Sequence, residues 1–353
     1  MTTAFASDAL STAQRWAADR LSVAGTPVTG PGVPLGPRAW SAHLRLPTTA
    51  GSAFLKVTAP VFRHEPEVTR LLAERCPGAV PAVLAAEPGR GWLLTADYGP
   101  QPRPADRAEL VAVFLAAAPV LARVQREAAP LAPALLRAGC PDHRLPVLPD
   151  RFAALVDACT SAAPPPGPDS PEPPSTGAEP PFSGAEPPSY GAEPISYGAE
   201  PISYGAEPPL TGAEVARLRG GRGQVARACA ALAATGLPDT VVHLDCWRGN
   251  LVVRDDAVLI ADWAESAVGH PWLSLDVLLG DVRAVEPAAE AAVADAYGAP
   301  AGTAPLTRLP ALVSRALLWR SATRSLTGAA RAAYAGTVTA HLRALATALE
   351  ETR

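Results

Sequence analysis

The segment 241–263, which reads VVHLDCWRGNLVVRDDAVLIADW, constrains the fold and function of this chain more than any other part of it. Its three apolar runs are typical of β-strands, and the acidic pair at 255–256 predicts a turn between the second and third. The hairpin brings Asp245 and Asn250 to one end of the strands, beside Asp262. Two carboxylates and an amide oxygen are ligands that suit Mg²⁺. The segment therefore favours phosphoryl transfer, in which a base orients a hydroxyl and metal ions bridge the phosphates.

The motif HLDCWRGN, followed by a strand that ends in IADW, resembles the aminoglycoside phosphotransferase and choline kinase-like branch of the protein kinase superfamily. That branch carries HGDxHxxN and then a hydrophobic strand ending in Asp-Trp or Asp-Phe. The resemblance implies that Asp245 is the catalytic base and that Asn250 and Asp262 hold Mg²⁺. It also implies that ATP binds between two lobes and that its γ-phosphate passes to a hydroxyl of a small molecule.

Lys56 is the only lysine among the 30 basic residues of the chain. In a composition shifted so far toward arginine, a lysine is expected to persist where a compact charge is needed and a planar guanidinium does not fit. Lys56 lies in the apolar run SAFLKVTAP, where the resemblance places the lysine that contacts the α- and β-phosphates. The alternative, a strand lysine with its head in solvent, is disfavoured by this composition.

The family holds that lysine with a glutamate from the following helix. The stretch FRHEPEVTRLLAERCP offers Glu65, Glu67 and Glu74 for this role. Related sequences carry the glutamate four residues before a threonine, which selects Glu65 ahead of Thr69. The alternative is a solvated carboxylate in the first helical turn, where the helix dipole stabilises it.

The resemblance and the apolar periodicity together predict a bilobal, protein kinase-like α+β fold. Residues 1–97 are expected to form the nucleotide-binding lobe, with a helix at 8–23, a five-stranded antiparallel sheet and a helix at 66–75. Residues 98–353 are expected to form a larger, mostly helical lobe for catalysis and substrate binding, with the catalytic hairpin among its helices.

The junction of the two lobes is predicted at 95–99. By the resemblance this hinge meets adenine through backbone groups, so Thr95 and Asp97 are expected to bind the nucleotide. The glycine-containing segment 30–41 is interpreted as the cover over the phosphates, although it lacks the glycine spacing of protein kinases.

Some positions near the motif depart from the family pattern. Leu244 stands where related enzymes usually have glycine, and Trp247 stands where histidine or a basic residue is common. The later GxPxxD element, whose aspartate braces the catalytic loop, appears as GHPWLS, so either Ser274 or Asp276 takes that place. Arg248 could approach a transferring phosphate, but a surface arginine in a turn is the preferred interpretation. These departures leave a second hypothesis open, namely a catalytically impaired homologue that binds nucleotide and acts as a regulatory or binding module.

Residues 163–212 are predicted to be a disordered insertion in the large lobe. GAEP-like units repeat there every seven residues, and their glycines and prolines remove helical propensity and backbone donors. Eight acidic and no basic residues lie between 163 and 214, so the formal net charge of -4 becomes +4 for the remainder. Because that remainder is only mildly basic and its arginines are scattered, nucleic acid is not an expected partner.

Other features fit a cytoplasmic enzyme that takes a small-molecule substrate. No apolar run approaches the roughly 20 residues that span a bilayer, and the N-terminus lacks the pattern of a secretion signal, so no membrane partner is expected.

The five cysteines are odd in number and scattered, which fits reduced thiols. No Gly-Lys-Ser/Thr tripeptide forms a P-loop. No APE-like element of a protein kinase follows Asp262. The oligomeric state is open.

The acceptor is expected to be a neutral or weakly charged hydroxylated metabolite. From residue 281 onward six acids stand against eight arginines, so charge matching disfavours a polycation such as an aminoglycoside. Trp263, Trp272, Trp319 and Tyr334 are candidates to stack on the acceptor. Core packing is the alternative for such large aromatic side chains.

Overall fold

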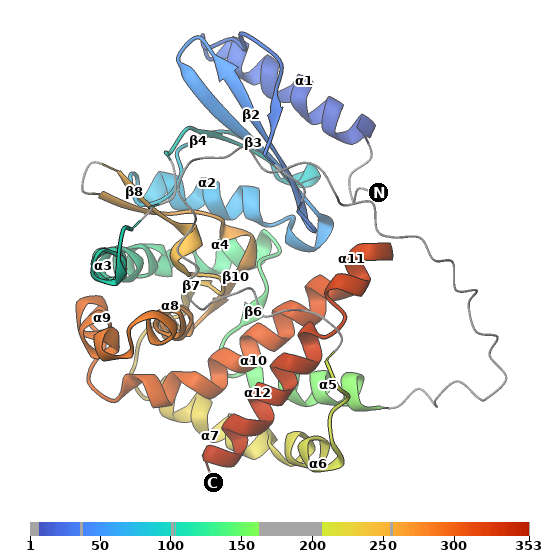
Figure 1. Ribbon diagram of the computed structural model, residues 1–353, viewed down its shortest axis with the longest axis vertical. Helices are drawn as coiled ribbons and strands as arrows, with labels where there is room; N and C mark the ends of the chain where they lie inside the picture. The colour runs from blue at the N-terminus through green and yellow to red at the C-terminus, as the bar shows by residue number, and fades with distance from the viewer. Residues whose placement is uncertain are drawn as a thin grey trace, which may run out of the picture.

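The computed structural model describes residues 7–35, 38–99, 102, 104–161, 207–254 and 257–352. These residues form two lobes, one built on a five-stranded sheet and the other made mostly of helices (Figure 1). The predicted bilobal, kinase-like fold class is therefore confirmed. The repeats up to residue 206, the predicted turn at 255–256 and positions 36–37 of the expected phosphate cover lie outside the described residues.

The small lobe consists of one antiparallel sheet with a helix on either side (Figure 1). Its strand order is β1-β2-β3-β5-β4, and every neighbouring pair is antiparallel. The elements are α1 (Ser7–Val23), β1 (Val33–Pro34), β2 (Ser41–Thr48), β3 (Gly51–Thr58), η1 (Pro60–Phe62), α2 (Glu65–Arg75), β4 (Val83–Glu87), η2 (Pro88–Arg90) and β5 (Trp92–Ala96).

The alternation of side chains along β3 decides where Lys56 points. Ala53, Leu55 and Val57 are buried in a core that they share with α1. Successive side chains of a strand face opposite sides of its sheet. Lys56 therefore projects from the face away from α1, toward α2 and the large lobe.

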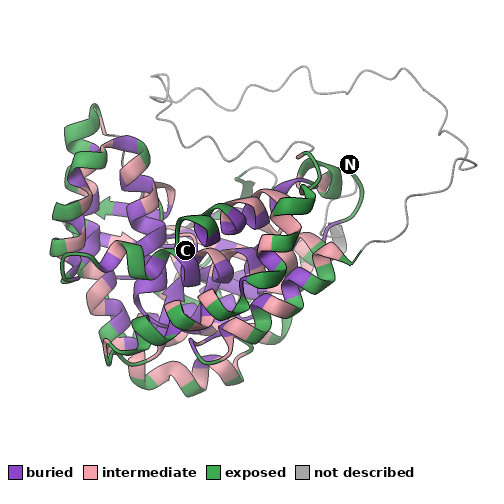
Figure 2. Cartoon of the chain, turned by 90° about the horizontal axis from the view of Figure 1, so that it is seen from below, coloured by how far each residue is buried: buried purple, intermediate pink, exposed green. Residues whose placement is uncertain are grey.

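The large lobe is built mostly of helices, and their inward faces are buried (Figure 2). Its elements are α3 (Arg107–Ala128), η3 (Ala129–Leu131), α4 (Ala132–Arg137), β6 (Asp142–His143), α5 (Leu148–Thr160), α6 (Gly212–Gly220), α7 (Arg222–Ala233), β7 (Thr240–His243), η4 (Arg248–Asn250), β8 (Leu251–Arg254), β9 (Ala257–Ile260), η5 (Trp263–Glu265), β10 (Ser266–Gly269), α8 (Trp272–Val285), η6 (Pro287–Ala289), α9 (Glu290–Tyr297), α10 (Thr303–Arg324), α11 (Gly328–Ala333) and α12 (Thr337–Glu351).

The segment 241–263 contributes to two small sheets rather than one. Strands β8 and β9 form the expected antiparallel hairpin. Strand β7 pairs instead with β10, which also runs parallel to β6. Each pairing continues for one residue beyond its strands, from Leu244 N to Glu265 O at 2.9 Å and from Ala261 N to Asn250 O at 2.8 Å. The His243 ring joins the two sheets, with its Nε2 3.0 Å from Ala261 O. The ends of β7 and β9 therefore meet.

Gln125, a buried amide on α3, ties the strands of the motif to the helices. Its Nε2 donates to the backbone oxygens of Val241 (3.2 Å) and Pro271 (2.9 Å) and to the hydroxyl of Ser274 (3.0 Å). The hydroxyl of Tyr297 donates to its Oε1 at 2.5 Å. A buried polar group with all its hydrogen bonds made specifies one arrangement of the elements around it. Gln125 thus fixes β7 against α8 and α9.

The stretch Arg107–Arg137 is apolar and long enough, by length and composition, to cross a membrane. The statement from the sequence that no run approaches this length is therefore wrong. The helix α3 within this stretch has the spacing of buried residues that marks a core helix. These residues are Leu110, Phe114, Ala117, Ala118, Leu121, Val124, Gln125 and Ala128.

The two lobes also touch directly. The indole Nε1 of Trp40, just before β2, donates to Ala322 O on α10 at 3.0 Å, and the Trp40 ring lies edge-on to Tyr334 at 4.7 Å. On the other side of the molecule, Ile260 N of β9 donates to Ala79 O at 2.8 Å. These contacts fix the small lobe over the motif.

The last residues of the predicted insertion, 207–212, lie against the large lobe. Arg343 on α12 forms ion pairs with Glu207 and Glu214. Thr211 caps α6, and its reciprocal hydrogen bonds with Glu214 form a capping box. The chain is therefore anchored before α6 begins.

Candidate active site

Lys56 lies between two carboxylates that come from different lobes. Its Nζ is 2.6 Å from Oε1 of Glu65 on α2 and 2.7 Å from Oδ1 of Asp262, which follows β9. Thr58 donates to the other oxygen of Glu65 at 2.8 Å. Glu65 is 1% exposed, so this ion pair is shielded from water. The three charged groups join the sheet, α2 and the catalytic hairpin at one point.

The other two candidate glutamates serve another partner. Arg70 Nη2 is 2.7 Å from Glu67 Oε1, and Arg70 Nη1 is 2.6 Å from Glu74 Oε1. Of the three glutamates considered from the sequence, Glu65 is therefore the one that forms the ion pair with Lys56.

The charges in this cluster stabilise one another. Burial by itself would lower the pKa of Lys56, but Asp262 and Glu65 raise this pKa above its ordinary range. Burial by itself would raise the pKa of Asp262, but the Lys56 ammonium lowers it well below its ordinary range. Asp262 also has a left-handed backbone with φ 60°, unlike every other described non-glycine residue. Such a conformation persists only where the surroundings enforce it.

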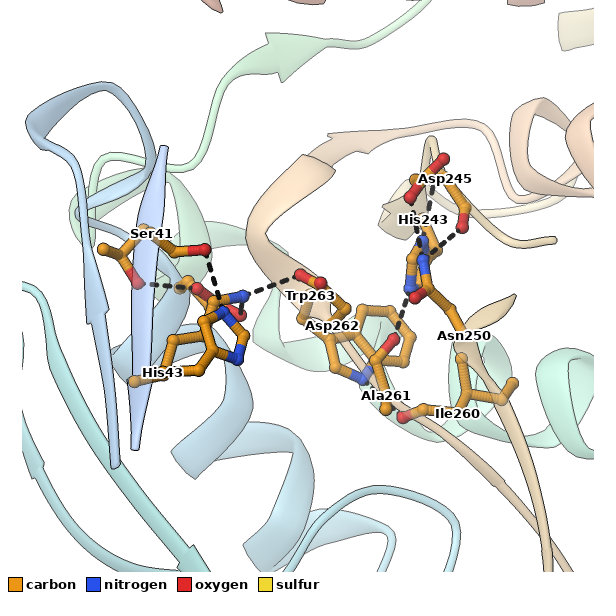
Figure 3. A network of polar contacts seen from close by, with 12 residues as sticks. Ser41, His43, His243, Asp245, Asn250, Ile260, Ala261, Asp262 and Trp263 are labelled. Atoms are coloured by element: carbon orange, nitrogen blue, oxygen red, sulfur yellow. Dashed lines mark hydrogen bonds and ion pairs between the residues drawn. The ribbon is translucent and has the colours of Figure 1, made fainter. Parts of the chain in front are cut away.

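The catalytic loop between β7 and β8 is fixed by Asn250 and His243 (Figure 3). Asn250 Nδ2 donates to the backbone oxygen and to Oδ2 of Asp245, both at 2.8 Å. His243 Nδ1 accepts from Asp245 N at 3.2 Å, so its Nε2 carries the proton and donates to Ala261 O at 3.0 Å. Burial lowers the pKa of His243, which keeps the ring neutral. His243 thus links Asp245 to the residue before Asp262.

The Asp245 carboxyl has a pKa raised from 3.8 to about 6. Burial is the main cause, and the negative charge of Asp262 adds to it. Arg315 and hydrogen bonds from Asn250 and Trp247 oppose the rise. The side chain is therefore ionised at neutral pH and basic enough to accept a proton.

Ser274 takes the place of the bracing aspartate of the family. Its hydroxyl accepts from His243 N at 2.7 Å and from Gln125 at 3.0 Å. The Asp276 carboxylate contacts other residues instead: its Oδ1 lies 3.4 Å from the Thr307 hydroxyl and 3.6 Å from Arg283 Nη2. The alternative left open by the sequence is thereby resolved in favour of Ser274.

The interpretation of Arg248 as a surface arginine is wrong. Its Nη1 is 2.6 Å from Asp281 Oδ1, and its backbone N donates to Asp281 Oδ2 at 2.8 Å. The two side chains are only 18% and 4% exposed. This ion pair fastens the catalytic loop to α8. In the same loop, a Cβ on Gly249 would lie 2.2 Å from the Trp247 ring, so any other residue there would displace this exposed side chain.

A cavity of about 810 Å³ extends from Lys56 past Asp245 and Asp262 to helices α8, α10 and α12. Thr95 and Asp97 are not among its lining residues. Thr95 is buried on β5, and Asp97 Oδ1 accepts from the backbone N of Gly99 at 2.9 Å, which shapes the turn after the strand. The cavity therefore brings together Lys56, Asp245 and Asp262, the residues predicted to act on the phosphates and the hydroxyl. The two predicted hinge residues, Thr95 and Asp97, lie outside it.

Two of the four aromatic residues considered for stacking on an acceptor lie away from the cavity. Trp263 is 0% and Trp272 6% exposed, and both belong to the main core. Trp319 is 7% exposed and belongs to the same core, but it lines the cavity together with Tyr334. Core packing thus accounts fully for Trp263 and Trp272, and Trp319 and Tyr334 are the two that face the cavity.

The chemistry of Asp262 and Asn250 fits a magnesium ion. The described residues contain no group of three or more His, Cys, Asp and Glu side chains placed to hold a metal. Magnesium bound with a nucleotide needs fewer protein ligands, because phosphate oxygens and water complete its octahedron. Asp262 offers a carboxylate that is 34% exposed, and Asn250, whose Nδ2 donates to Asp245, offers an amide oxygen. These two residues suffice for such a site.

Sequence reasoning missed several residues that build this site. Gln125, Asp281 and Arg315 lie on α3, α8 and α10, far in sequence from the residues that they serve. For Gln125 a signal exists, since it is a polar residue on the apolar face of a helix. Asp281 and Arg315 offer no such local signal.

Comparison with known proteins supports the fold. No family model and no curated protein matches the sequence. A choline/ethanolamine kinase family protein from Mesorhizobium loti matches the structure with a TM-score of 0.53 and 16% identity, covering 97% of this chain and 99% of its own. The choline kinase LicA from Streptococcus pneumoniae matches with a TM-score of 0.55 and 12% identity, covering 95% and 99%. LicA in complex with AMP also matches, with a TM-score of 0.55 and 10% identity, covering 96% and 98%.

A macrolide 2'-phosphotransferase of type I is similar to the same extent. Its TM-score is 0.53 at 15% identity, over 92% of this chain and 96% of its own. The chain therefore has the kinase-like fold of small-molecule phosphotransferases over nearly its full length.

The raised pKa of Asp245 predicts that Asp245→Asn stabilises the nucleotide-free protein at neutral pH. The folded pKa of about 6 exceeds the ordinary 3.8, so stability falls as pH rises from 3.8 through 6 and the loss then stays constant. The isosteric amide removes this loss, which is on the order of 2–3 kcal/mol. Thermal unfolding without Mg²⁺ should show a melting temperature several degrees higher at pH 7.5 and no gain near pH 4.

Asp150→Asn is the matched control, because Asp150 is 74% exposed and pairs with Arg222 at the surface. Exposed pairs contribute about 0–1 kcal/mol, so this variant should melt close to the wild type at both pH values. An Asp245→Asn protein that melts below the wild type at pH 7.5 would contradict the burial argument.

Proposed function

We propose that this protein is an ATP-dependent phosphotransferase that moves the γ-phosphate of ATP to a hydroxyl group of a small molecule. The proposal rests on one observation. Lys56, Asp245 and Asp262, from separate parts of the chain, line a single cavity between the lobes. Phosphoryl transfer requires a cation for the phosphates, a metal-binding carboxylate and a base for the hydroxyl.

Lys56 supplies the fixed cation. Glu65 and Asp262 hold its ammonium from opposite sides, which orients it toward the space where the phosphates would lie. A lysine held by a glutamate on the following helix is the arrangement of kinase active sites. Binding of AMP by a structurally similar choline kinase agrees with a nucleotide at this position.

Asp262 and Asn250 are the residues that would hold Mg²⁺. A bound Mg²⁺ would offset the negative charge that develops on the phosphates during transfer. The low pKa of Asp262 suits this role, because the carboxylate stays ionised at any physiological pH. Asn250 also donates to Asp245, so it sets the position of the base.

Asp245 acts as the base for the acceptor hydroxyl. The hydroxyl oxygen forms a bond to the γ-phosphorus as the bond from that phosphorus to the β–γ bridging oxygen breaks, and ADP leaves. The hydroxyl proton passes to Asp245, whose pKa of about 6 lies close to the pH at which it works. Ser274, His243 and Arg248 keep the loop of Asp245 in place.

The acceptor is a small molecule. A volume of about 810 Å³ is that of a small-ligand site. Helices α8, α10 and α12 supply the walls beyond Asp245, so a folded protein substrate could not reach the base. Charge matching disfavours a polycation, since Arg283, Arg308 and Arg315 stand on this side of the cavity.

The direct test is ADP release by purified protein with MgATP and panels of amino alcohols, sugars, nucleosides and hydroxy acids. We expect at least one class to stimulate release. Asp245→Asn should lower this turnover by roughly 10²- to 10⁴-fold, because the loss of a positioned base has that effect. Asp239→Asn is the control, since Asp239 lies outside the cavity and just before β7.

Two outcomes would overturn the proposal. Unchanged turnover in Asp245→Asn would remove Asp245 from its role. Stabilisation by MgATP without ADP release in the presence of any acceptor would favour the nucleotide-binding module that the departures at Ser274 and in the phosphate cover permit.

The pH dependence offers an independent prediction. Because the base must be ionised, kcat/KM should fall tenfold per pH unit below about pH 6 and level off above it. A stopped assay between pH 5 and 8 measures this profile. A flat profile over that range would show that no group with this pKa acts as the base.

A further inference from the structure

We infer that the acceptor carries an anionic group a few bonds from its reacting hydroxyl, and that Arg315 on α10 binds this anion. The inference rests on the proposed function and narrows its substrate class. It goes beyond the expectation of a neutral or weakly charged acceptor. Three features of the cavity support it: the partners of its charged groups, the position of Arg315 and the buried nitrogen of this arginine.

The acidic residues on the acceptor side of the cavity have cationic partners or are disfavoured in their charged form. Asp281 is held by Arg248 at 2.6 Å, and Asp276 lies 3.6 Å from Arg283. Burial, together with the charge of Asp245, raises the pKa of Glu265 well above its ordinary value and so disfavours its charged form. A cationic acceptor would therefore find little unpaired negative charge beyond Asp245 itself.

The charge of Arg315, unlike the charges of these acidic residues, has no partner among the described residues. In the described part of the chain its guanidinium forms no ion pair, and its buried Nε has no hydrogen-bond partner. Arg283 on α8, by contrast, is 2.6 Å from Glu290, and Arg308 is 3.9 Å from Glu351. A buried donor without a partner costs free energy that a bound acceptor atom would recover.

Arg315 also stands close to the reacting position. It lines the same cavity as Asp245, and its charge acts on the carboxyls of Asp245 and Glu265. An anion on Arg315 would therefore belong to the molecule whose hydroxyl meets Asp245. A planar guanidinium fits a carboxylate with two parallel hydrogen bonds, which makes a hydroxy acid the best match.

A purely structural role makes a different prediction. If Arg315 served only to keep Asp245 ionised, its loss would shift the pH profile upward and change the rate for neutral and anionic acceptors alike. If it binds the acceptor, its loss must raise KM for anionic acceptors selectively.

The test uses acceptors of similar shape and different charge with MgATP: glucose, glucuronate and glucosamine, and the shorter set glycerol, glycerate and 3-amino-1,2-propanediol. In each set we expect the acid to give the highest kcat/KM. Arg315→Gln should raise KM for the acid about 10- to 100-fold and leave KM for the neutral member within about twofold. Arg315→Lys should recover part of the loss, because it keeps the charge without the fork.

Arg320→Gln is the matched control, since Arg320 lies on the same helix but outside the cavity, and its kinetics should equal those of the wild type. Preference for the neutral or cationic member, or an unchanged KM for the acid in Arg315→Gln, would overturn the inference.

A second measurement does not depend on turnover. The ¹⁵N-bound proton at Nε of Arg315, assigned by its absence in Arg315→Lys, should shift saturably when acetate is added and not when sodium chloride is added to equal ionic strength. No shift with acetate would overturn the inference even if the protein is an active kinase. A shift in a protein that releases no ADP would retain the anion site and refute the proposed function.

Discussion

The ion pairs of Lys56 with Glu65 and Asp262 are the interaction on which the rest of the site depends. One ammonium connects the small-lobe sheet, its helix α2 and the catalytic hairpin at 2.6 and 2.7 Å. Removing one member of such a buried group leaves an uncompensated charge and costs about 3–5 kcal/mol. The position of the small lobe over the hairpin therefore depends on the ion pairs of Lys56 with Glu65 and Asp262.

Around this cluster the large lobe fixes each catalytic group through buried polar contacts. Gln125 holds β7 and Ser274, Ser274 holds His243, and His243 links Asp245 to the end of β9. The chain of contacts is continuous, so Asp245 and Asp262 keep a defined separation. Asp245 is held at the expense of stability, because burial and the charge of Asp262 outweigh the attraction of Arg315 and raise the pKa of its carboxyl.

Much of the fold could be predicted from the sequence, because local patterns encode it. The alternation along β3 places Lys56 opposite the core residues Leu55 and Val57, and the acidic start of α2 places Glu65 within its reach. The hairpin of β8 and β9 follows from its apolar runs. What could not be predicted depends on how elements distant in sequence pack.

The brace of the catalytic loop illustrates this limit. Ser274 rather than Asp276 faces His243 because Gln125, 149 residues earlier in the chain, sets the rotation of α8. The burial of Arg248 depends in the same way on Asp281, 33 residues later. Likewise β7 pairs with β10, which follows the hairpin in the chain, rather than with β8 or β9. No local sequence pattern records these choices.

The central claim is that Lys56, gripped between Glu65 and Asp262, holds the phosphates of a magnesium nucleotide. Titration calorimetry of a non-hydrolysable MgATP analogue with wild type and Lys56→Arg tests it most directly. The substitution keeps the charge, but the guanidinium fork does not fit the space of a compact ammonium. Binding should weaken by roughly tenfold or more, as expected when a charge-assisted contact to phosphate is lost. Equal affinity in the two proteins, with Lys56→Arg folded, would contradict the account.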